Sequence, residues 1–332
     1  MMKLYDDKLI VVTGGAGFIG SGVIRYLNDR GMTKNIVVVD ELGKTEKWKN
    51  LVGKKFGEFI PKDQLLQWLK GRDSEIEAFV HLGACSDTTE KDASYLLENN
   101  YRYSVDLAEY ALKYGHRFIY ASSAATYGDG SLGFCDDHDR LESLQPLNMY
   151  GYSKHMFDLW ALQQGVLGSV VGLKYFNVFG PNEYHKAHMA SAVTRMVPDT
   201  LHHGLIKLFK SSEPGKYGDG DQVRDFIYVK DAVRITCKFL ENDVSGIFNV
   251  GSGKASRWNS LAKAVIKALK KPDAKVEYID MPETLRGKYQ NYTCADMNKF
   301  SISLSEAAAT TLPLEDSVAD YVQNYLLKGT RW

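Results

Sequence analysis

The stretch Leu9-Ile10-Val11-Val12-Thr13-Gly14-Gly15-Ala16-Gly17-Phe18-Ile19-Gly20 decides the fold. Its first four residues form an uninterrupted apolar run, which is typical of a strand buried on both faces. The run enters a glycine-rich turn that opens a helix. Gly15-x-Gly17-x-x-Gly20 has the spacing in which glycine permits a tight turn, close approach of backbone to a pyrophosphate and close packing of helix on strand. The sequence therefore predicts a dinucleotide-binding βαβ unit, with a glycine-rich packing turn as the alternative.

Asp40 strengthens this prediction but leaves the type of dinucleotide open. It ends the next apolar run, 36–39, about 20 residues beyond the turn, where a carboxylate can meet the adenosine ribose of NAD. The polar stretch that follows contains Lys44, Lys47 and Lys49. These lysines either form a solvated loop or reach a 2′-phosphate and favour NADP. Asp40 and Lys47 thus point to different cofactors.

Length and composition indicate an ordinary water-soluble α/β protein. The 332 residues are enough for one large unit or two domains. Lys+Arg and Asp+Glu number 41 each, so no overall charge attracts nucleic acid or an anionic membrane. The four cysteines are scattered without metal-ligand spacing, which favours reduced thiols over a disulfide or a metal site. No apolar run approaches the roughly 18 residues of a membrane span. We expect a cytoplasmic protein.

The order of apolar runs and helical patterns predicts a doubly wound parallel Rossmann sheet with a smaller, discontinuous mixed α/β substrate domain. The expected dinucleotide-binding domain comprises residues 1–176 and 219–245, and the expected substrate domain comprises residues 177–218 and 246–332. Within the first, the segment from Arg224 to Val229 is expected to be a strand that returns to the dinucleotide domain.

Ser123, Tyr150 and Lys154 form the candidate catalytic group. Ser123 follows a predicted strand, whereas Tyr150 and Lys154 are four residues apart and share one face of a predicted helix. An ammonium there can lower the pKa of the phenol, which at about 10 is otherwise too high for a base at neutral pH. Ser123 can hydrogen-bond the reacting oxygen, and Lys154 can reach the cofactor ribose. The alternatives are a serine that stabilises a turn and a chance YxxxK spacing.

The segments 13–20 and 121–128, together with Tyr150-x-x-x-Lys154, resemble the extended short-chain dehydrogenase/reductase family. That family includes nucleotide-sugar epimerases and dehydratases. Further stretches narrow the resemblance to the members that invert C6 of an ADP-linked heptose, and the likeness covers nearly the whole chain. These stretches are Gly83–Ser86 with Thr88–Glu90, Tyr175–Pro181, His185-Lys186 with Met189–Ser191, Arg224–Phe226, Ser245–Asn249 and Gly287–Gln290.

The resemblance implies a reaction without net redox change. The sugar carbon would give its hydride to bound NAD(P), form a 6-keto sugar and receive the hydride back on the opposite face. Tyr150 and Lys186 are implied as the two acid/base groups, and we expect burial or neighbouring positive charge to lower the pKa of Lys186. The resemblance further implies NADP rather than NAD, an ADP-heptose substrate, a role in making lipopolysaccharide core precursors, and a homo-oligomer, specifically a pentamer.

The resemblance also implies two sets of contact residues. The cofactor set comprises Gly14, Gly17, Phe18, Ile19, Gly20, Asp40, Glu41, Lys47, Lys62, Leu82, Gly83, Ala84, Cys85, Ser86, Asn99, Lys154, Val178 and Lys186. The substrate set comprises Ser123, Asn177, His188, Arg195, Phe209, Lys210, Ser211, Ser212, Arg224 and Tyr289. His188 departs from the small hydroxyl residue expected at its position. From its chemistry alone, Arg224 suits a diphosphate oxygen, with a structural ion pair as the alternative.

The sequence leaves three other functions open: an epimerase of another sugar nucleotide, a 4,6-dehydratase and a non-catalytic scaffold. A sugar-nucleotide 4,6-dehydratase needs an additional acid/base pair beside the serine, where this chain has Ala124 and Ala125. A non-catalytic dinucleotide-binding scaffold would not need to combine Ser123, Tyr150 and Lys154. The dehydratase and the scaffold both fit the sequence less well than an epimerase does.

Overall fold

The computed structural model describes residues 7–283 and 289–332, so Gly287 and Lys288 of the motif at 287–290 lie outside the described residues. Its main body is a seven-stranded sheet in the order β3-β2-β1-β4-β5-β6-β10, with every neighbouring pair parallel. This order confirms the predicted doubly wound fold. The strands are β1 (Leu9–Thr13), β2 (Ile36–Asp40), β3 (Glu58–Pro61), β4 (Ile76–His81), β5 (Arg117–Ser123), β6 (Val170–Tyr175) and β10 (Gly246–Val250).

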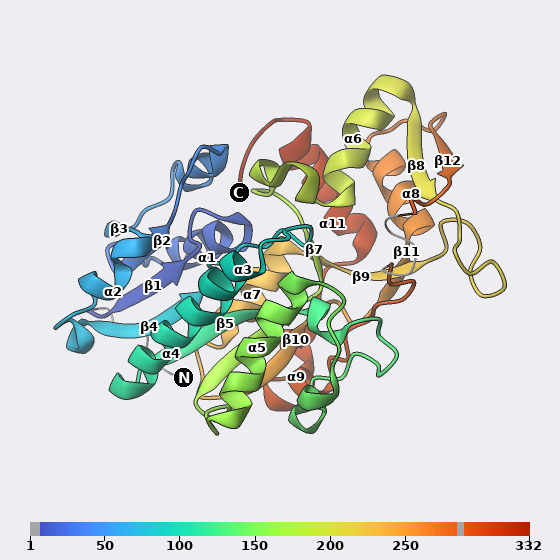
Figure 1. Ribbon diagram of the computed structural model, residues 1–332. Coiled ribbons are helices and arrows are strands. Elements are labelled where there is room, and N and C mark those ends of the chain that lie inside the picture. Colours follow the sequence, from blue (N-terminus) through green and yellow to red (C-terminus); the bar gives the residue numbers. More distant parts are fainter. Residues whose placement is uncertain (1–6, 284–288) are drawn as a thin grey trace.

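The large sheet is covered on both faces, as its uninterrupted apolar strands require. In β1, Ile10 and Val12 belong to one buried apolar cluster, whereas Val11 belongs to the other. The first cluster includes α1 (Phe18–Asn28) and α7 (Val229–Lys238), and the second includes α4 (Tyr103–Tyr114) and α5 (Met149–Gln163). Figure 1 shows α4 and α5 in front of the sheet.

The helical segment that precedes β5 is composite. It begins as α3 (Ala93–Leu96), continues through a π-helical turn, η4 (Leu97–Arg102), and becomes α4. Gly115 then adopts φ 73, a left-handed conformation that ends the helix without a Cβ clash. Short helical segments connect other parts of the chain: η1 (Glu46–Leu51), η2 (Lys62–Gln64), α2 (Leu65–Trp68), η3 (Asp73–Glu75), η5 (Ala124–Tyr127), η6 (His138–Ser143) and η7 (Tyr184–Met189).

A smaller region holds two further sheets and most of the C-terminal helices. The three-stranded sheet has the order β11-β9-β7, and β8 pairs with β12 in parallel. Figure 1 shows α6, α8, β8 and β12 grouped at the upper right, away from the large sheet. The elements of this region are β7 (Asn177–Phe179), α6 (Ala192–His203), β8 (Leu205–Phe209), β9 (Val223–Tyr228), β11 (Ala255–Arg257), α8 (Trp258–Ala268), β12 (Lys275–Ile279), α11 (Leu314–Tyr321) and η8 (Val322–Leu326). Two further C-terminal helices lie against the large-sheet body: α9 (Asn298–Ser303) packs on β10, and α10 (Glu306–Ala309) packs on α7.

Two strands lie in a different region from the one that the expected domain boundaries assign to them. β10 falls in the expected substrate domain, yet it pairs with β6 as the edge strand of the large sheet. β9 falls in the expected dinucleotide domain, yet it lies between β7 and β11. An apolar run specifies a strand but not its pairing partner, which comes from distant sequence. Within the described residues, no helix combines the length and apolar character needed to span a membrane.

Candidate active site

The glycine-rich turn brings the carboxyl ends of β1 and β4 into contact. Gly14 has φ 65, and a Cβ there would lie 2.7 Å from the backbone nitrogen of Gly83. A Cβ on Gly20 would lie 2.2 Å from the carbonyl oxygen of Gly14. A side chain at either position would fill the turn. Because both residues are glycine, the backbone stays open to a ligand at the N-terminus of α1. The turn lies where the strand order reverses, which is where this fold binds dinucleotides.

Asp40 and Lys47 form one ion pair instead of acting separately. The Lys47 Nζ lies 2.7 Å from Asp40 Oδ1, which also accepts a 2.7 Å hydrogen bond from the backbone N–H of Glu41. Asp40 Oδ2 accepts a 2.8 Å hydrogen bond from the N–H of Ala16 in the glycine-rich turn. The buried carboxylate is therefore fixed to the turn and compensated by a cation.

Further cofactor candidates near this edge of the sheet are connected by hydrogen bonds and an ion pair. Lys62 Nζ is 3.1 Å from Glu41 and donates a 2.9 Å hydrogen bond to Asn99. The neighbouring Asn100, absent from the sequence prediction, accepts from the N–H of Cys85 at 2.8 Å and donates to its carbonyl at 3.0 Å. Asn100 also donates to Ser153 of α5 at 3.0 Å. The sequence signal that could have identified Asn100 is a polar residue within a helical segment. Leu82, Ala84 and Ser86 follow the end of β4, and Ile19 lies in the first turn of α1.

Tyr150 and Ser123 meet at the start of α5, and Lys154 lies on the same helix. Asn148 caps α5 by accepting the N–H of Gly151 at 2.8 Å, which places Tyr150 in the first turn. Ser123 ends β5 and hydrogen-bonds the Tyr150 phenol. Lys154 is buried one turn further along the helix.

The electrostatics of this group differ from the prediction that Lys154 lowers the pKa of Tyr150. Burial raises the pKa of Tyr150, and the hydrogen bond with Ser123 opposes that rise. Burial also lowers the pKa of Lys154 to about 8, against the opposing attraction of Asp158. Desolvation favours the neutral form of both groups, so it outweighs the expected stabilisation of a phenolate.

A fully buried ion pair lies behind the catalytic helix. Lys174 Nζ of β6 is 2.9 Å from Asp158 of α5, and Tyr120 of β5 donates a 2.9 Å hydrogen bond to the same carboxylate. Lys174 also donates to the Thr126 hydroxyl at 2.5 Å, and Thr126 in turn donates to the carbonyl of Ser123 at 2.8 Å. The pair thereby links α5 to the strand end that carries Ser123.

Lys186 lies in η7, on the side of the glycine-rich turn. Its Nζ is 5.5 Å from the centre of the Phe18 ring, and Phe18 is the first residue of α1. Burial lowers the pKa of Lys186, and the carboxylate of Glu183 opposes that shift. The predicted lowering of this pKa by desolvation is therefore confirmed, and a lowered pKa makes the amine a more accessible base.

Arg224 is a buried cation held among aromatic rings. Its guanidinium carbon lies 4.6 Å from the ring centre of Tyr289 and 5.9 Å from that of Trp258. Nη1 donates to the carbonyl of Val223 at 2.8 Å. Across residues 7–283 and 289–332, no carboxylate lies within ion-pair distance of Arg224, so the alternative of a structural ion pair is wrong. A buried cation without a counter-ion favours binding of an anionic ligand.

The remaining substrate candidates are only partly brought together. The Phe209 ring meets that of Tyr289 edge to face at 6.2 Å. The segment after Phe209 makes polar contacts of its own: Lys210 to Asp280 at 3.2 Å, Ser211 to Asp219 at 2.8 Å and Ser212 to Asn291 at 3.3 Å. Asn177 and Val178 lie in β7, and Arg195 is exposed on α6. His188 is 65% exposed and lies 3.3 Å from Asp87.

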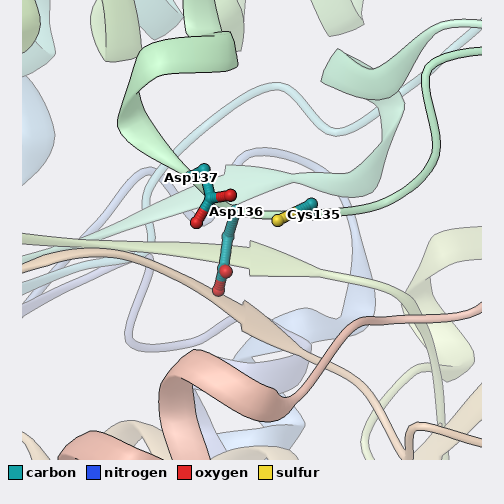
Figure 2. A group of neighbouring side chains, drawn as sticks. All are labelled: Cys135, Asp136 and Asp137. Atoms are coloured by element: carbon teal, nitrogen blue, oxygen red, sulfur yellow. The ribbon is translucent and has the colours of Figure 1, made fainter.

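Cys135, Asp136 and Asp137 are metal-ligand types whose donor atoms lie within 4.8 Å of one another. Figure 2 shows the two carboxylates pointing in different directions. The Asp136 carboxylate accepts a 2.7 Å hydrogen bond from the backbone N–H of Asn249 in β10. Asp136 therefore has a structural partner, and it attaches this segment to the edge strand β10.

The sequence pattern of the NAD dependent epimerase/dehydratase family matches residues 10–251. This chain belongs to that family. It is 50% identical to the ADP-L-glycero-D-manno-heptose-6-epimerase of Nitratidesulfovibrio vulgaris, over 96% of this chain and 98% of the relative. It is 46% identical to the enzyme of the same name from Fusobacterium nucleatum, with the same coverage.

Solved structures of the epimerase/dehydratase family share this fold. The Helicobacter pylori ADP-L-glycero-D-manno-heptose-6-epimerase matches with a TM-score of 0.80 and 29% identity, over 98% of each chain. A UDP-glucose 4-epimerase of Thermotoga maritima matches with a TM-score of 0.77 and 25% identity, over 97% of this chain and 99% of that one. Family membership and the open glycine-rich turn together support a nicotinamide dinucleotide as cofactor.

Proposed function

We propose that this protein inverts C6 of ADP-D-glycero-D-manno-heptose to give ADP-L-glycero-D-manno-heptose, a precursor of the lipopolysaccharide core. The observation that carries the proposal is the presence of two half-buried acid/base groups near one dinucleotide turn. The Tyr150 phenol forms a hydrogen bond with Ser123 at the end of β5, and Lys186 lies beside Phe18 at the start of α1. The near full-length likeness to heptose epimerases supports this substrate over other sugar nucleotides.

Each acid/base group serves one epimer in the proposed mechanism. The bound nicotinamide supplies the acceptor and donor of the C6 hydride. One of Tyr150 and Lys186 removes the C6 hydroxyl proton of the first epimer while Ser123 donates a hydrogen bond to the reacting oxygen. The other returns a proton to the carbonyl oxygen on the opposite face. Lys154 holds the cofactor ribose and supports the proton transfers of Tyr150.

We infer NADP as the cofactor. Lys47 compensates the charge of Asp40, so the carboxylate repels a 2′-phosphate less than a free one would. Lys62 adds a second cation beside Glu41. The test is the mass of the dinucleotide released when freshly purified protein is denatured. The mass of NAD would contradict this inference.

The sugar nucleotide is proposed to bind across the smaller region. Arg224 suits the diphosphate because a guanidinium can bond two phosphate oxygens at once. Phe209 and Tyr289 lie beside it, and the segment 177–218 supplies Lys186. We further propose that the enzyme acts in the cytoplasm as a homopentamer, which sedimentation of the holoenzyme would test.

Product stereochemistry tests the proposed function directly. Purified protein is incubated with ADP-D-glycero-D-manno-heptose, and NMR distinguishes inversion at C6 from loss of water or no change. Tyr150→Phe and Lys186→Ala should each slow inversion by roughly 10²- to 10⁴-fold, because each removes an acid/base group. The exposed neighbours Tyr152 and Lys207 give the controls Tyr152→Phe and Lys207→Ala, which should keep the normal rate. Normal turnover in Lys186→Ala would contradict the two-base mechanism.

A further inference from the structure

Asn50 is a buried asparagine that joins three distant segments of the chain. It lies in η1 and is 1% exposed. Its Nδ2 donates to the carbonyl of Ala16 in the glycine-rich turn and to the carbonyl of Asn182, both at 3.0 Å. Its Oδ1 accepts a 3.1 Å hydrogen bond from Arg331 Nε. One side chain therefore ties the cofactor turn to the segment that precedes Lys186.

The segment 330–332, which we call the tail clamp, holds Asn182 from the other side. The Trp332 N–H donates to Asn182 Oδ1 at 2.9 Å, and Asn182 Nδ2 donates to the Trp332 oxygen at 3.0 Å. Lys54 Nζ donates to the same Trp332 oxygen at 2.5 Å. The Trp332 ring packs against α1, since a Cβ on Gly22 would lie 2.8 Å from it.

The tail clamp also contacts η7, the segment that carries Lys186. The Tyr184 hydroxyl donates to the carbonyl of Thr330 at 2.8 Å. The Arg331 guanidinium carbon lies 5.3 Å from the centre of the Tyr184 ring. Tyr184 is two residues before Lys186, so these contacts act next to the amine-bearing residue.

The backbone around Lys186 is strained and needs such support. Asn182 has φ 80 and Ala187 has φ 47, both in the left-handed region that non-glycine residues rarely adopt. Such conformations persist only where neighbouring contacts hold them. The Asn50 and tail-clamp hydrogen bonds supply these contacts at Asn182.

We propose that Asn50 and the tail clamp are positioning elements that fix Lys186 relative to the glycine-rich turn. This inference rests on the proposed function, in which Lys186 exchanges a proton with the substrate oxygen. Lysine has a long, flexible side chain, so its reach to a reacting atom depends on where its backbone is held. Asn50 bonds both the turn and the Lys186 segment, and it thereby sets their separation directly.

The test compares hydride transfer started from each epimer separately. Holoenzyme is mixed with one ADP-heptose epimer, and the absorbance of the reduced nicotinamide follows a single turnover. If Lys186 serves one epimer, Asn50→Ala should slow that half-reaction by roughly 10- to 100-fold and spare the other, in the same sense as Lys186→Ala. Tyr184→Phe, which keeps the ring and removes only the bond to Thr330, should shift the ratio of the two rates in the same direction.

Asn28→Ala is the matched control. The Asn28 side chain makes three hydrogen bonds to backbone groups, with partners at Met32 and Lys55, but it lies at the far end of α1. Asn28→Ala should leave the ratio of the two half-reaction rates unchanged. Any variant that only weakens the fold should do the same. Equal slowing of both half-reactions in Asn50→Ala, or no slowing, would overturn the positioning role. Normal epimerisation by Lys186→Ala would instead overturn the proposed function.

Discussion

At the scale of single residues, burial favours the uncharged form of each proposed acid/base group. It raises the pKa of Tyr150 and lowers the pKa of Lys186. A neutral phenol can donate a proton, and a neutral amine can accept one. The two pKa shifts therefore run in complementary directions: a lowered lysine pKa favours Lys186 as the base and a raised phenol pKa favours Tyr150 as the acid in one direction of the epimerisation. The reverse direction exchanges these roles.

The lowered pKa of Lys154 predicts a pH limit on activity. Burial brings this pKa to about 8, so the ammonium that supports Tyr150 and holds the ribose is lost as pH rises through that value. We expect kcat/KM for epimerisation to fall above about pH 8. Arginine stays protonated there, so the residual activity of Lys154→Arg should lack this decline. A wild-type profile that stays flat well above pH 8, with the fold intact by circular dichroism, would contradict the prediction.

Arg224 should act mainly on substrate affinity. Removing a charge-assisted contact to the diphosphate costs about 1.5–3 kcal/mol, which corresponds to a rise in KM of roughly 10- to 100-fold. We expect this for Arg224→Ala with kcat changed much less, because the contact exists before and during hydride transfer. Arg257→Ala, at an exposed arginine of the neighbouring strand β11, is the control. Similar KM values in both variants would exclude a diphosphate contact.

At the scale of elements, the position of α5 depends on a buried ion pair as well as on its own sequence. Asn148 fixes the first turn of α5, but Asp158 connects its second half to Lys174 of β6. Through Thr126, the same lysine reaches the strand end of Ser123. The relative placement of Ser123 and Tyr150 thus depends on contacts between three elements.

Lys174→Met should therefore be strongly destabilising. It leaves the Asp158 carboxylate buried without its cation, which costs about 3–5 kcal/mol of unfolding free energy. The control is Arg25→Ala, which breaks the exposed pair between Arg25 and Asp29 at 2.8 Å in α1 and should cost about 0.3–0.5 kcal/mol. Urea unfolding measures both. Equal losses in the two variants would show that the buried pair contributes no more than a surface pair.

At the scale of the whole molecule, the edge strand β10 is attached through polar groups of segment 134–138. Asp136 accepts the N–H of Asn249, and His138 Nε2 accepts the N–H of Ile247 at 3.0 Å. Burial raises the pKa of Asp136 to about 6, although the Asn249 N–H opposes that rise. A segment far from β10 in sequence, 113 residues apart at the Asp136–Asn249 contact, thus completes the large sheet, and it does so at the cost of burying a carboxylate.

This raised pKa predicts how stability changes with pH. The neutral carboxyl is favoured in the folded protein, so its stabilising contribution is complete below the unfolded pKa of about 4 and is lost as pH rises through about 6. Relative to Asp136→Asn, which keeps an acceptor oxygen, the wild type should lose up to about 3 kcal/mol between these pH values. Asp137→Asn, at the exposed neighbour, should follow the wild type. Parallel curves for wild type and Asp136→Asn would contradict the prediction.

The sequence by itself determined the parts of this protein that depend on local spacing. The apolar run at 9–12, the glycines of the turn, Asp40 at the next strand end and the four-residue spacing of Tyr150 and Lys154 predicted the sheet, its ligand edge and the meeting of the tyrosine with Ser123. These features follow from strand and helix periodicity, which neighbouring residues specify.

Only the tertiary structure decided which distant segments meet and how burial acts on them. It placed β10 in the large sheet and β9 outside it, and it reversed the expected direction of the Tyr150 pKa. Among the residues that the structure describes, it left Arg224 without a carboxylate partner. It also joined Asn50 to Asn182 and Arg331. The physical reason is that strand pairing, desolvation and long-range hydrogen bonds depend on the packing of the whole chain, whereas sequence spacing reports only on neighbours.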